Sequence, residues 1–533
     1  MAKWLLSIFR YTAIGLAALL LSYTLLPIIG LLLGLRDIGS VNLLTVFEST
    51  RIRYLLFDSL RIAVSVGLLS STLGFVLASI LKRMSHLLRN IVAGTLLLLY
   101  LLSPYLLAQS FIALLGEKGI IWQAFDSGAL FSIYTVSGVI AIATIWLTPL
   151  ALIIHLSANT LPFGYHDELK ALNVSWLKWI RYYAFPAYGT AFLLSFGLCS
   201  LVAFWNYDLA SMLRVNVFPI DVMAAFGSFY DYKMALELII FPGVMSLVLL
   251  GLLGWCASKH LWGATVRDNR ANAQVQTGFT PVQGLVLIGV LIGYAIFLSS
   301  LWNTIGNYDV FETEIAKFQS EWSNTIKYGM FGTIIVLFVS FLMSMLGRLS
   351  SDRTSRWIAS FTVLIWLFPP VLLGMGWISV WNLPLLEMGR RWGIEMYLIG
   401  IHSASTIVPI LVVVMSLRWR RSNNEALKGV CGSIWTRILL FFNSQRGLIG
   451  ILLFIGFATI VREVPAGLLN MPPDGSTLAL SIETLLHFEQ PARVASICLA
   501  YFLTIFICCV FFCFLGYVFD QFNKALLQRH LKV

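Results

Sequence analysis

The sequence predicts an all-α polytopic membrane protein with about twelve transmembrane helices, arranged as two parallel six-helix repeats. Three observations lead to this prediction. The 533-residue chain is 59% hydrophobic and only 11% charged, whereas soluble domains carry about 25% charged residues. Apolar runs of about 20 residues, the length that crosses a hydrocarbon core of about 30 Å, recur along the whole chain. Polar and proline landmarks of the first half also return in the second half at a nearly constant offset.

The predicted spans are apolar runs bounded by polar or charged residues. The first run follows Lys3 and Arg10 and is too long for a signal-peptide core, so we interpret it as a span. In chain order the predicted spans lie near residues 11–33, 59–81, 91–115, 132–156, 187–206, 235–257, 281–302, 325–347, 357–381, 397–417, 447–464 and 493–518.

The distribution of charge predicts the topology. With the N-terminus inside, most of the 36 Lys and Arg residues fall on segments of one side, and such an excess marks the cytoplasmic face. Segment 303–324, on the opposite side, carries several acidic residues and one basic residue, Lys317. Both termini are therefore expected in the cytoplasm. The net charge of +11 is interpreted as an orientation signal, and no nucleic-acid partner is expected.

The two halves of the chain repeat. Asp58 corresponds to Asn324, and Pro104 to Pro370, each 266 positions later, while later pairs are offset by 258 to 260. Because each copy has six spans, both copies have the same orientation in the membrane. The predicted division is a first half of six spans at 1–258, a cytoplasmic linker at 259–280 and a second half of six spans at 281–533.

Two long loops, between the fourth and fifth spans of each half, carry the strongest functional signal. They are residues 167–186 and 425–444. In the first, Leu169, Leu172 and Trp176 recur at helical spacing and form an apolar stripe. Such an amphipathic segment can pack on the base of the bundle, lie in the lipid interface or enter the groove of a partner.

Both loops resemble the EAA loop of the inner-membrane permeases of binding-protein-dependent ABC importers, in a fused form that supplies both membrane halves. The segment 462–479 resembles the iron(III) and thiamine branch of that family. Asn173 and Cys431 stand where the pattern has glycine, so neither loop is a consensus copy. The resemblance implies that the following residues dock the ATPase: Asp167, Glu168, Ala171, Asn173, Ser175, Glu425, Ala426, Cys431, Gly432 and Ser433.

The resemblance also implies the partners and the location. Two copies of an ABC ATPase subunit and an extracytoplasmic substrate-binding protein are expected, in the lipid bilayer of a bacterial inner membrane. The most favoured substrate is iron(III), with thiamine, polyamine and phosphonate left open. The chain contains no Gly-Lys dipeptide and hence no phosphate-binding P-loop. We therefore expect no enzyme activity and no cofactor in this chain, with ATP used by the partner subunits.

A second group of residues is predicted to line the path or its gate. Ionisable residues within or beside spans are functional candidates by default, although carboxylates at an interface can also snorkel or pair locally. Proline often merely kinks a membrane helix, but the matched prolines favour bent, path-lining helices. The candidates are Pro104, Pro370, Asp208, Glu237, Arg462 and Glu463. No metal site is expected, because the seven Cys and seven His show no ligand spacing.

The alternative function is a proton- or ion-coupled secondary transporter of the major facilitator type, which also has two parallel halves of six spans. The segment Gly347–Arg356 resembles the Gly-x-x-x-Asp-Arg motif of that family. Two long amphipathic loops have no evident role in such a transporter, and they favour the ABC permease.

Overall fold

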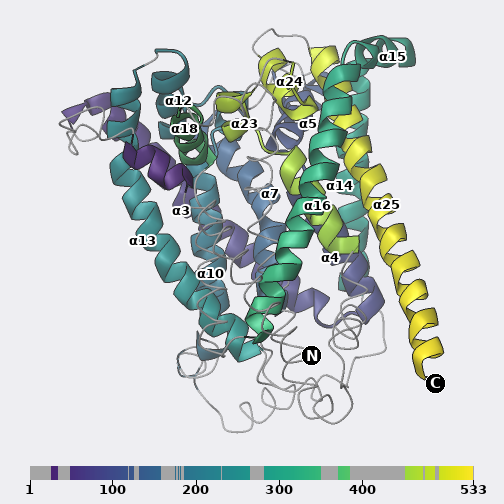
Figure 1. Cartoon of the computed structure of the whole chain (residues 1–533). Helices are drawn as coiled ribbons and strands as arrows, with labels where there is room; N and C mark the ends of the chain where they lie inside the picture. The colour runs from purple at the N-terminus through teal and green to yellow at the C-terminus, as the bar shows by residue number, and fades with distance from the viewer. Residues whose placement is uncertain are drawn as a thin grey trace. The chain divides into compact units, whose positions relative to one another are not determined.

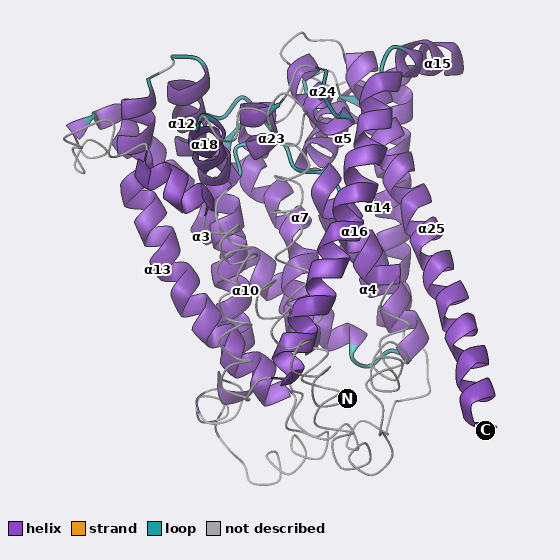
Figure 2. Cartoon of the chain, in the orientation of Figure 1, coloured by secondary structure: helices purple, strands orange, loops and turns teal. Residues whose placement is uncertain are grey.

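The structure is a computed structural model of the chain, and it describes the residues that follow. They are 26–33, 48–117, 119–124, 131–157, 175, 178, 181, 185–229, 231–264, 281–349, 370–383, 450–471, 474–486 and 491–531. These residues form helices joined by turns and loops, and no strand occurs among them (Figure 2). The all-α prediction is therefore confirmed for the part of the chain that the structure describes.

Six helices of the described part are long and apolar enough to cross a membrane. They match predicted spans and are α3 (Thr50–Leu81), α7 (Val136–Ser157), α10 (Phe185–Trp205), α13 (Tyr232–Ala264), α14 (Pro281–Ile305) and α25 (Pro491–Leu531). A further long helix, α16 (Gln319–Leu349), covers the predicted span 325–347. The predicted span 397–417 lies outside the described residues, and the spans 11–33 and 357–381 are described only in part.

The predicted span 91–115 is broken in the structure. It consists of α4 (His86–Leu101) and α5 (Pro104–Leu115), and the segments Leu87–Leu101 and Pro104–Gln123 are bent by 91° relative to each other. Leu102 and Ser103 at the bend have extended backbone, because the ring of a following proline disfavours the helical conformation of the residue before it. Pro104 then starts a new helix at its first position, where a missing N–H costs nothing.

The chain divides into two compact units, and each unit contains residues from both predicted halves. Unit 1 contains Met1–Arg36, Ala316–Ser481 and Ala500–Val533, and unit 2 contains Asp37–Ile315 and Ile482–Leu499. The first predicted span of the second half, α14, thus belongs to the unit of the first half. The compact units are defined by contacts in space, whereas the predicted halves are defined by a repeat in the sequence. The units therefore do not test the halves, which stay a prediction.

In unit 2, α3 packs most closely against α7 and α10 (Figure 1). Small residues allow this close packing, because a residue with little or no side chain lets the backbones of two helices approach each other. A Cβ atom added at Gly74 would lie 2.7 Å from Cβ of Ala151 and 2.8 Å from the backbone nitrogen of Leu152. The hydroxyl of Ser70 donates to the carbonyl oxygen of Thr144 at 3.3 Å across the same interface.

Unit 1 uses the same principle at several crossings. The helical residues 26–33 cross α18 (Pro370–Trp381) where Gly30 and Gly376 meet backbone to backbone. On α16, a Cβ added at Gly332 would lie 2.7 Å from the Cδ1 atom of Ile460. Glycines at these positions therefore set how closely the helices of the unit pack.

We expect Gly74→Ala to destabilise the protein by about 1–3 kcal/mol, the usual cost of overpacking a close interface. The matched control is Gly94→Ala on α4, where no atom lies within 4 Å of the added Cβ. There the better helix propensity of alanine should leave stability unchanged or raise it by up to ~1 kcal/mol. Thermal unfolding in lipid nanodiscs measures both variants, and an equal change in the two would contradict the packing account.

Candidate functional site

Two pairs of short helices interrupt the bundle after the fifth predicted span of each half. In unit 2 they are α11 (Asp208–Met212) and α12 (Phe218–Gly227). Their second-half counterparts are α23 (Pro465–Asn470) and α24 (Leu478–Leu486). Arg214, with φ 54°, lies four residues before α12, and Asp474, with φ 61°, lies four residues before α24. Left-handed backbone is uncommon for non-glycine residues, and here it occurs at two positions that are 260 residues apart.

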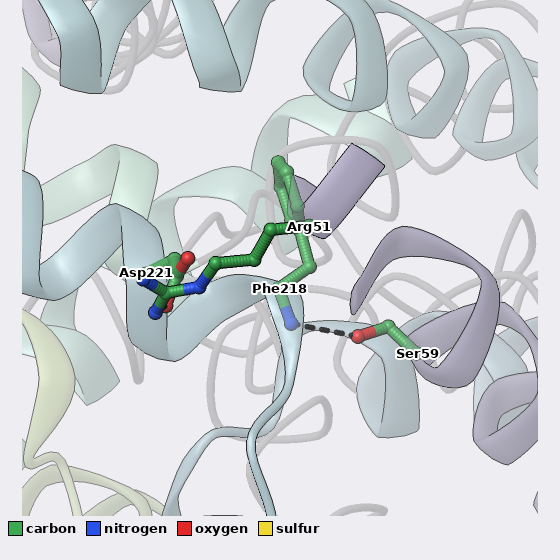
Figure 3. A network of polar contacts seen from close by, with 4 residues as sticks. All are labelled: Arg51, Ser59, Phe218 and Asp221. Atoms are coloured by element: carbon green, nitrogen blue, oxygen red, sulfur yellow. Dashed lines mark hydrogen bonds and ion pairs between the residues drawn. The ribbon is translucent and has the colours of Figure 1, made fainter. Parts of the chain in front are cut away.

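A hydroxyl group anchors the start of the second short helix in each half. The backbone N–H of Phe218, the first residue of α12, donates to Oγ of Ser59 on α3 at 2.9 Å, and both are buried (Figure 3). In unit 1 the backbone N–H of Leu478, the first residue of α24, donates to Oγ1 of Thr325 at 2.9 Å. Thr325 follows Ser59 by 266 positions, the offset predicted from the flanking residues. The same interaction therefore occurs at two positions that the predicted repeat pairs.

An ion pair accompanies this anchor in the first half. Nη2 of Arg51 lies 2.9 Å from Oδ1 of Asp221, so α3 and α12 are linked beside the Ser59 bond (Figure 3). At the same offsets the second half has Lys317 and Ser481. Ser481 carries no charge, and its hydroxyl instead lies 3.1 Å from that of Ser476. The two anchors therefore share a hydrogen bond but differ in charge.

Asp208 is part of a buried polar cluster in unit 2. The hydroxyl of Tyr105, in the first turn of α5, donates to Oδ1 of Asp208 at 3.1 Å. Glu483 on α24 lies near the same hydroxyl and interacts with it electrostatically. Tyr105, Asp208 and Glu483 are 0%, 5% and 6% exposed. The phenol thus hydrogen-bonds one buried carboxylate and lies near a second, so residues of α5, α11 and α24 meet in this cluster.

Glu463, which like Asp208 lies near the end of the fifth predicted span of its half, has a different local role. Its carboxylate accepts from the backbone N–H of Ala466 at 3.2 Å and caps the start of α23. In the first half, the equivalent cap is Asn206, whose side-chain oxygen accepts from the N–H of Leu209 at 3.1 Å. The functional counterpart of Glu463 by geometry is therefore Asn206 rather than Asp208.

The remaining path candidates are placed as follows. Pro104 is buried in the first turn of α5, and Pro370 is the first residue of α18. Glu237 is buried on α13, with 9% of its surface exposed, and Arg462 is half-buried just before Glu463. Of the six candidates, Asp208 alone belongs to the Tyr105 cluster. A path lined by all six residues stays a prediction.

The candidate docking residues lie almost entirely outside the described part of the chain. Ser175 is described and is exposed. The others, outside the described residues, are Asp167, Glu168, Ala171, Asn173, Glu425, Ala426, Cys431, Gly432 and Ser433.

Sequence reasoning missed most of these residues, including Ser59, Thr325, Tyr105 and Glu483. A signal existed for the first two, because they lie within the matched segments 58–61 and 324–327. Tyr105 stands beside the matched proline, but its counterpart 266 positions later is Val371. Repeat matching therefore gives no reason to select it.

Comparisons with known proteins find no match: no protein-family model, no curated protein and no solved structure matches the chain. Among the described residues, no group of three or more His, Cys, Asp or Glu side chains could hold a metal ion. The interpretation of the site therefore depends on its geometry and on the motifs in the sequence.

Ser59→Ala should destabilise the protein by about 1–3 kcal/mol, because it leaves the buried N–H of Phe218 without its acceptor. Ser79→Ala on the same helix is the control, since that hydroxyl is exposed and bonds only within α3. Thr325→Val should cost a similar amount in the second half. Thermal unfolding in nanodiscs provides the measurement, and a Ser59 variant no less stable than the Ser79 variant would disprove the anchor.

Tyr105→Phe should also lower the stability by about 1–3 kcal/mol, because the buried carboxylate of Asp208 loses a hydrogen-bond donor. Tyr54→Phe serves as the control, since Tyr54 is 66% exposed. Both replacements remove one hydroxyl from a tyrosine, so the difference between their unfolding midpoints isolates the buried cluster. No difference would mean that the Tyr105 hydroxyl contributes nothing to the cluster.

Proposed function

We propose that the chain is the transmembrane permease subunit of an ABC importer. It has twelve spans in two parallel repeats, with both termini in the cytoplasm of a bacterium. It passes a substrate, iron(III) as the first candidate, from an extracytoplasmic binding protein to the cytoplasm. Two copies of a separate ATPase subunit drive the transport.

The observation that carries the proposal is the pair of short helices anchored on a hydroxyl group in each predicted half, together with the duplicated loop that is expected in the cytoplasm. In the first half a helix break precedes Pro104, and Pro370, 266 positions later, is the first described residue of α18. Two short helices start on the hydroxyl groups of Ser59 and Thr325. Transporters built from parallel repeats place discontinuous helices at the substrate path, so this arrangement supports a permease with two matched halves.

The two long loops indicate that transport is driven by ATP hydrolysis in a separate protein. Residues 167–186 and 425–444 are expected in the cytoplasm on the basis of charge, and each has an acidic residue at its start, Asp167 or Glu425. Because the chain has no P-loop of its own, coupling to ATP requires a second protein. Amphipathic loops with an acidic start fit that docking role.

Buried carboxylates support a cation as the substrate. Asp208 and Glu237 are buried in the helices of unit 2, and ionisable residues at such places commonly mark an ion pathway in membrane proteins. A path must release its cargo, so weak and transient contacts are expected of these residues. Tight selection of the substrate is then left to the binding protein.

Asp167→Arg and Glu425→Arg should each abolish most of the ATPase activity that the binding protein stimulates, because a reversed charge opposes docking. The double variant should abolish transport. Asp352→Arg, another acidic residue expected in the cytoplasm but outside both loops, should leave both activities near the starting level. The assay uses nanodiscs or liposomes with the co-purified ATPase, and full transport by the double variant contradicts the proposal.

The same liposomes distinguish the alternative. Uptake of radioactive iron(III), thiamine, polyamine and phosphonate is measured with ATP inside and with a proton gradient alone. ATP-dependent uptake of one of them identifies the substrate. Uptake by the chain alone, driven by the proton gradient, would support a transporter of the major facilitator type instead.

A further inference from the structure

The segment that follows α14 in unit 2 turns sharply into a separate short helix. Gly306 has φ 89°, a left-handed conformation that ends helices and favours glycine. The side-chain oxygen of Asn307 then accepts from the backbone N–H of Val310 at 3.0 Å and caps α15 (Tyr308–Ala316). Figure 1 shows α15 lying across the end of α14.

Two contacts hold α15 in this position. The rings of Trp302 on α14 and Phe311 on α15 meet edge to face, with centroids 6.3 Å apart, and Tyr308 adjoins Phe311 with centroids 6.4 Å apart. At the far end, Nε of Arg493 on α25 lies 2.6 Å from Oε2 of Glu314. The helix is therefore fixed at both ends, although none of its residues is buried.

The lateral surface of α14 leads directly to these aromatic residues. Of the six candidate spans, α14 is the least enclosed, with 17% of its apolar window buried. Ile288 and Leu291 are more than half exposed on it, which fits contact with lipid chains. Trp302 follows Leu291 by eleven positions, or about three helical turns, and is 41% exposed on the same face. It marks the end of the lipid-facing stripe.

The residues of α15 separate into an apolar stripe and a polar face. Tyr308, Phe311 and Ile315 recur at spacings of three and four residues and share one side. Thr313 lies on the opposite side of the helix. Tryptophan and tyrosine concentrate at the boundary between lipid and water, and an amphipathic helix can lie in that plane with its apolar side in the lipid.

We infer that α15 is an interfacial helix whose Tyr308–Phe311–Ile315 stripe lies on the lipid bilayer at the end of α14. Its partner is the bilayer, because the stripe continues the lipid-facing surface of α14 through Trp302. Asp309 and Glu312 are acidic, so the attachment is apolar rather than an attraction to anionic headgroups. The inference does not depend on the proposed transport function.

The test measures the depth of two positions on opposite sides of α15. An encoded fluorescent amino acid replaces either Tyr308 or Thr313 in the full-length protein in nanodiscs, which avoids labelling the native cysteines. Nitroxide-labelled lipids quench probes in the bilayer, and iodide quenches probes in water. We expect stronger nitroxide quenching at 308, and iodide quenching that is several times stronger at 313.

Two outcomes would overturn the inference. Equal access of iodide to both positions would place the stripe in water, and protection of position 308 from both quenchers would place it against protein. Thermal unfolding first checks that each variant is folded. If replacement of Tyr308 unfolds the protein, positions 315 and 313 provide an equivalent pair on opposite sides of the helix.

Discussion

The arrangement of the short helices depends on where their first backbone N–H groups find acceptors. The first N–H groups of a helix have no partner within the helix, and away from water an unsatisfied group costs several kcal/mol. α12 and α24 each begin inside the helical bundle, and the hydroxyls of Ser59 and Thr325 accept from their first residues. Asn206 and Glu463 do the same near the starts of α11 and α23. Helices can be broken at these points because side chains of the chain itself replace water.

In both predicted halves a hydroxyl accepts from the first N–H of a short helix, but the side chains around this hydrogen bond differ. The first half adds the Arg51–Asp221 ion pair and the Tyr105–Asp208 hydrogen bond. At the matching positions the second half has Ser481 and Val371, which can form neither. The first N–H of each short helix needs an acceptor in both copies, so that acceptor is retained. Side chains that bond no backbone group are under no such requirement and differ between the copies. In the proposed permease, the halves would thus share an architecture while presenting different surfaces to the substrate.

Much of this fold could be predicted from patterns along the chain. Apolar length located the helices α3, α7, α10, α13, α14 and α25, because the thickness of a bilayer sets the length of a span. Matched prolines indicated a bend, and the structure has it at Pro104. The docking loops were selected by motif alone, and they lie outside the described residues. The Tyr105 cluster escaped prediction because Tyr105 and Glu483 are far apart in sequence and belong to no shared motif.

The sequence by itself determined that the chain is a membrane-type helical protein and where its six long apolar helices of the described part lie, and it predicts which positions of the two halves correspond. These properties follow from local composition and from offsets along the chain. Only the tertiary structure decided that Ser59 and Thr325 anchor short helices, that Glu463 corresponds to Asn206, and that α14 joins the unit of the first half. Such pairings depend on which distant groups meet when helices pack, and no local pattern of residues encodes them.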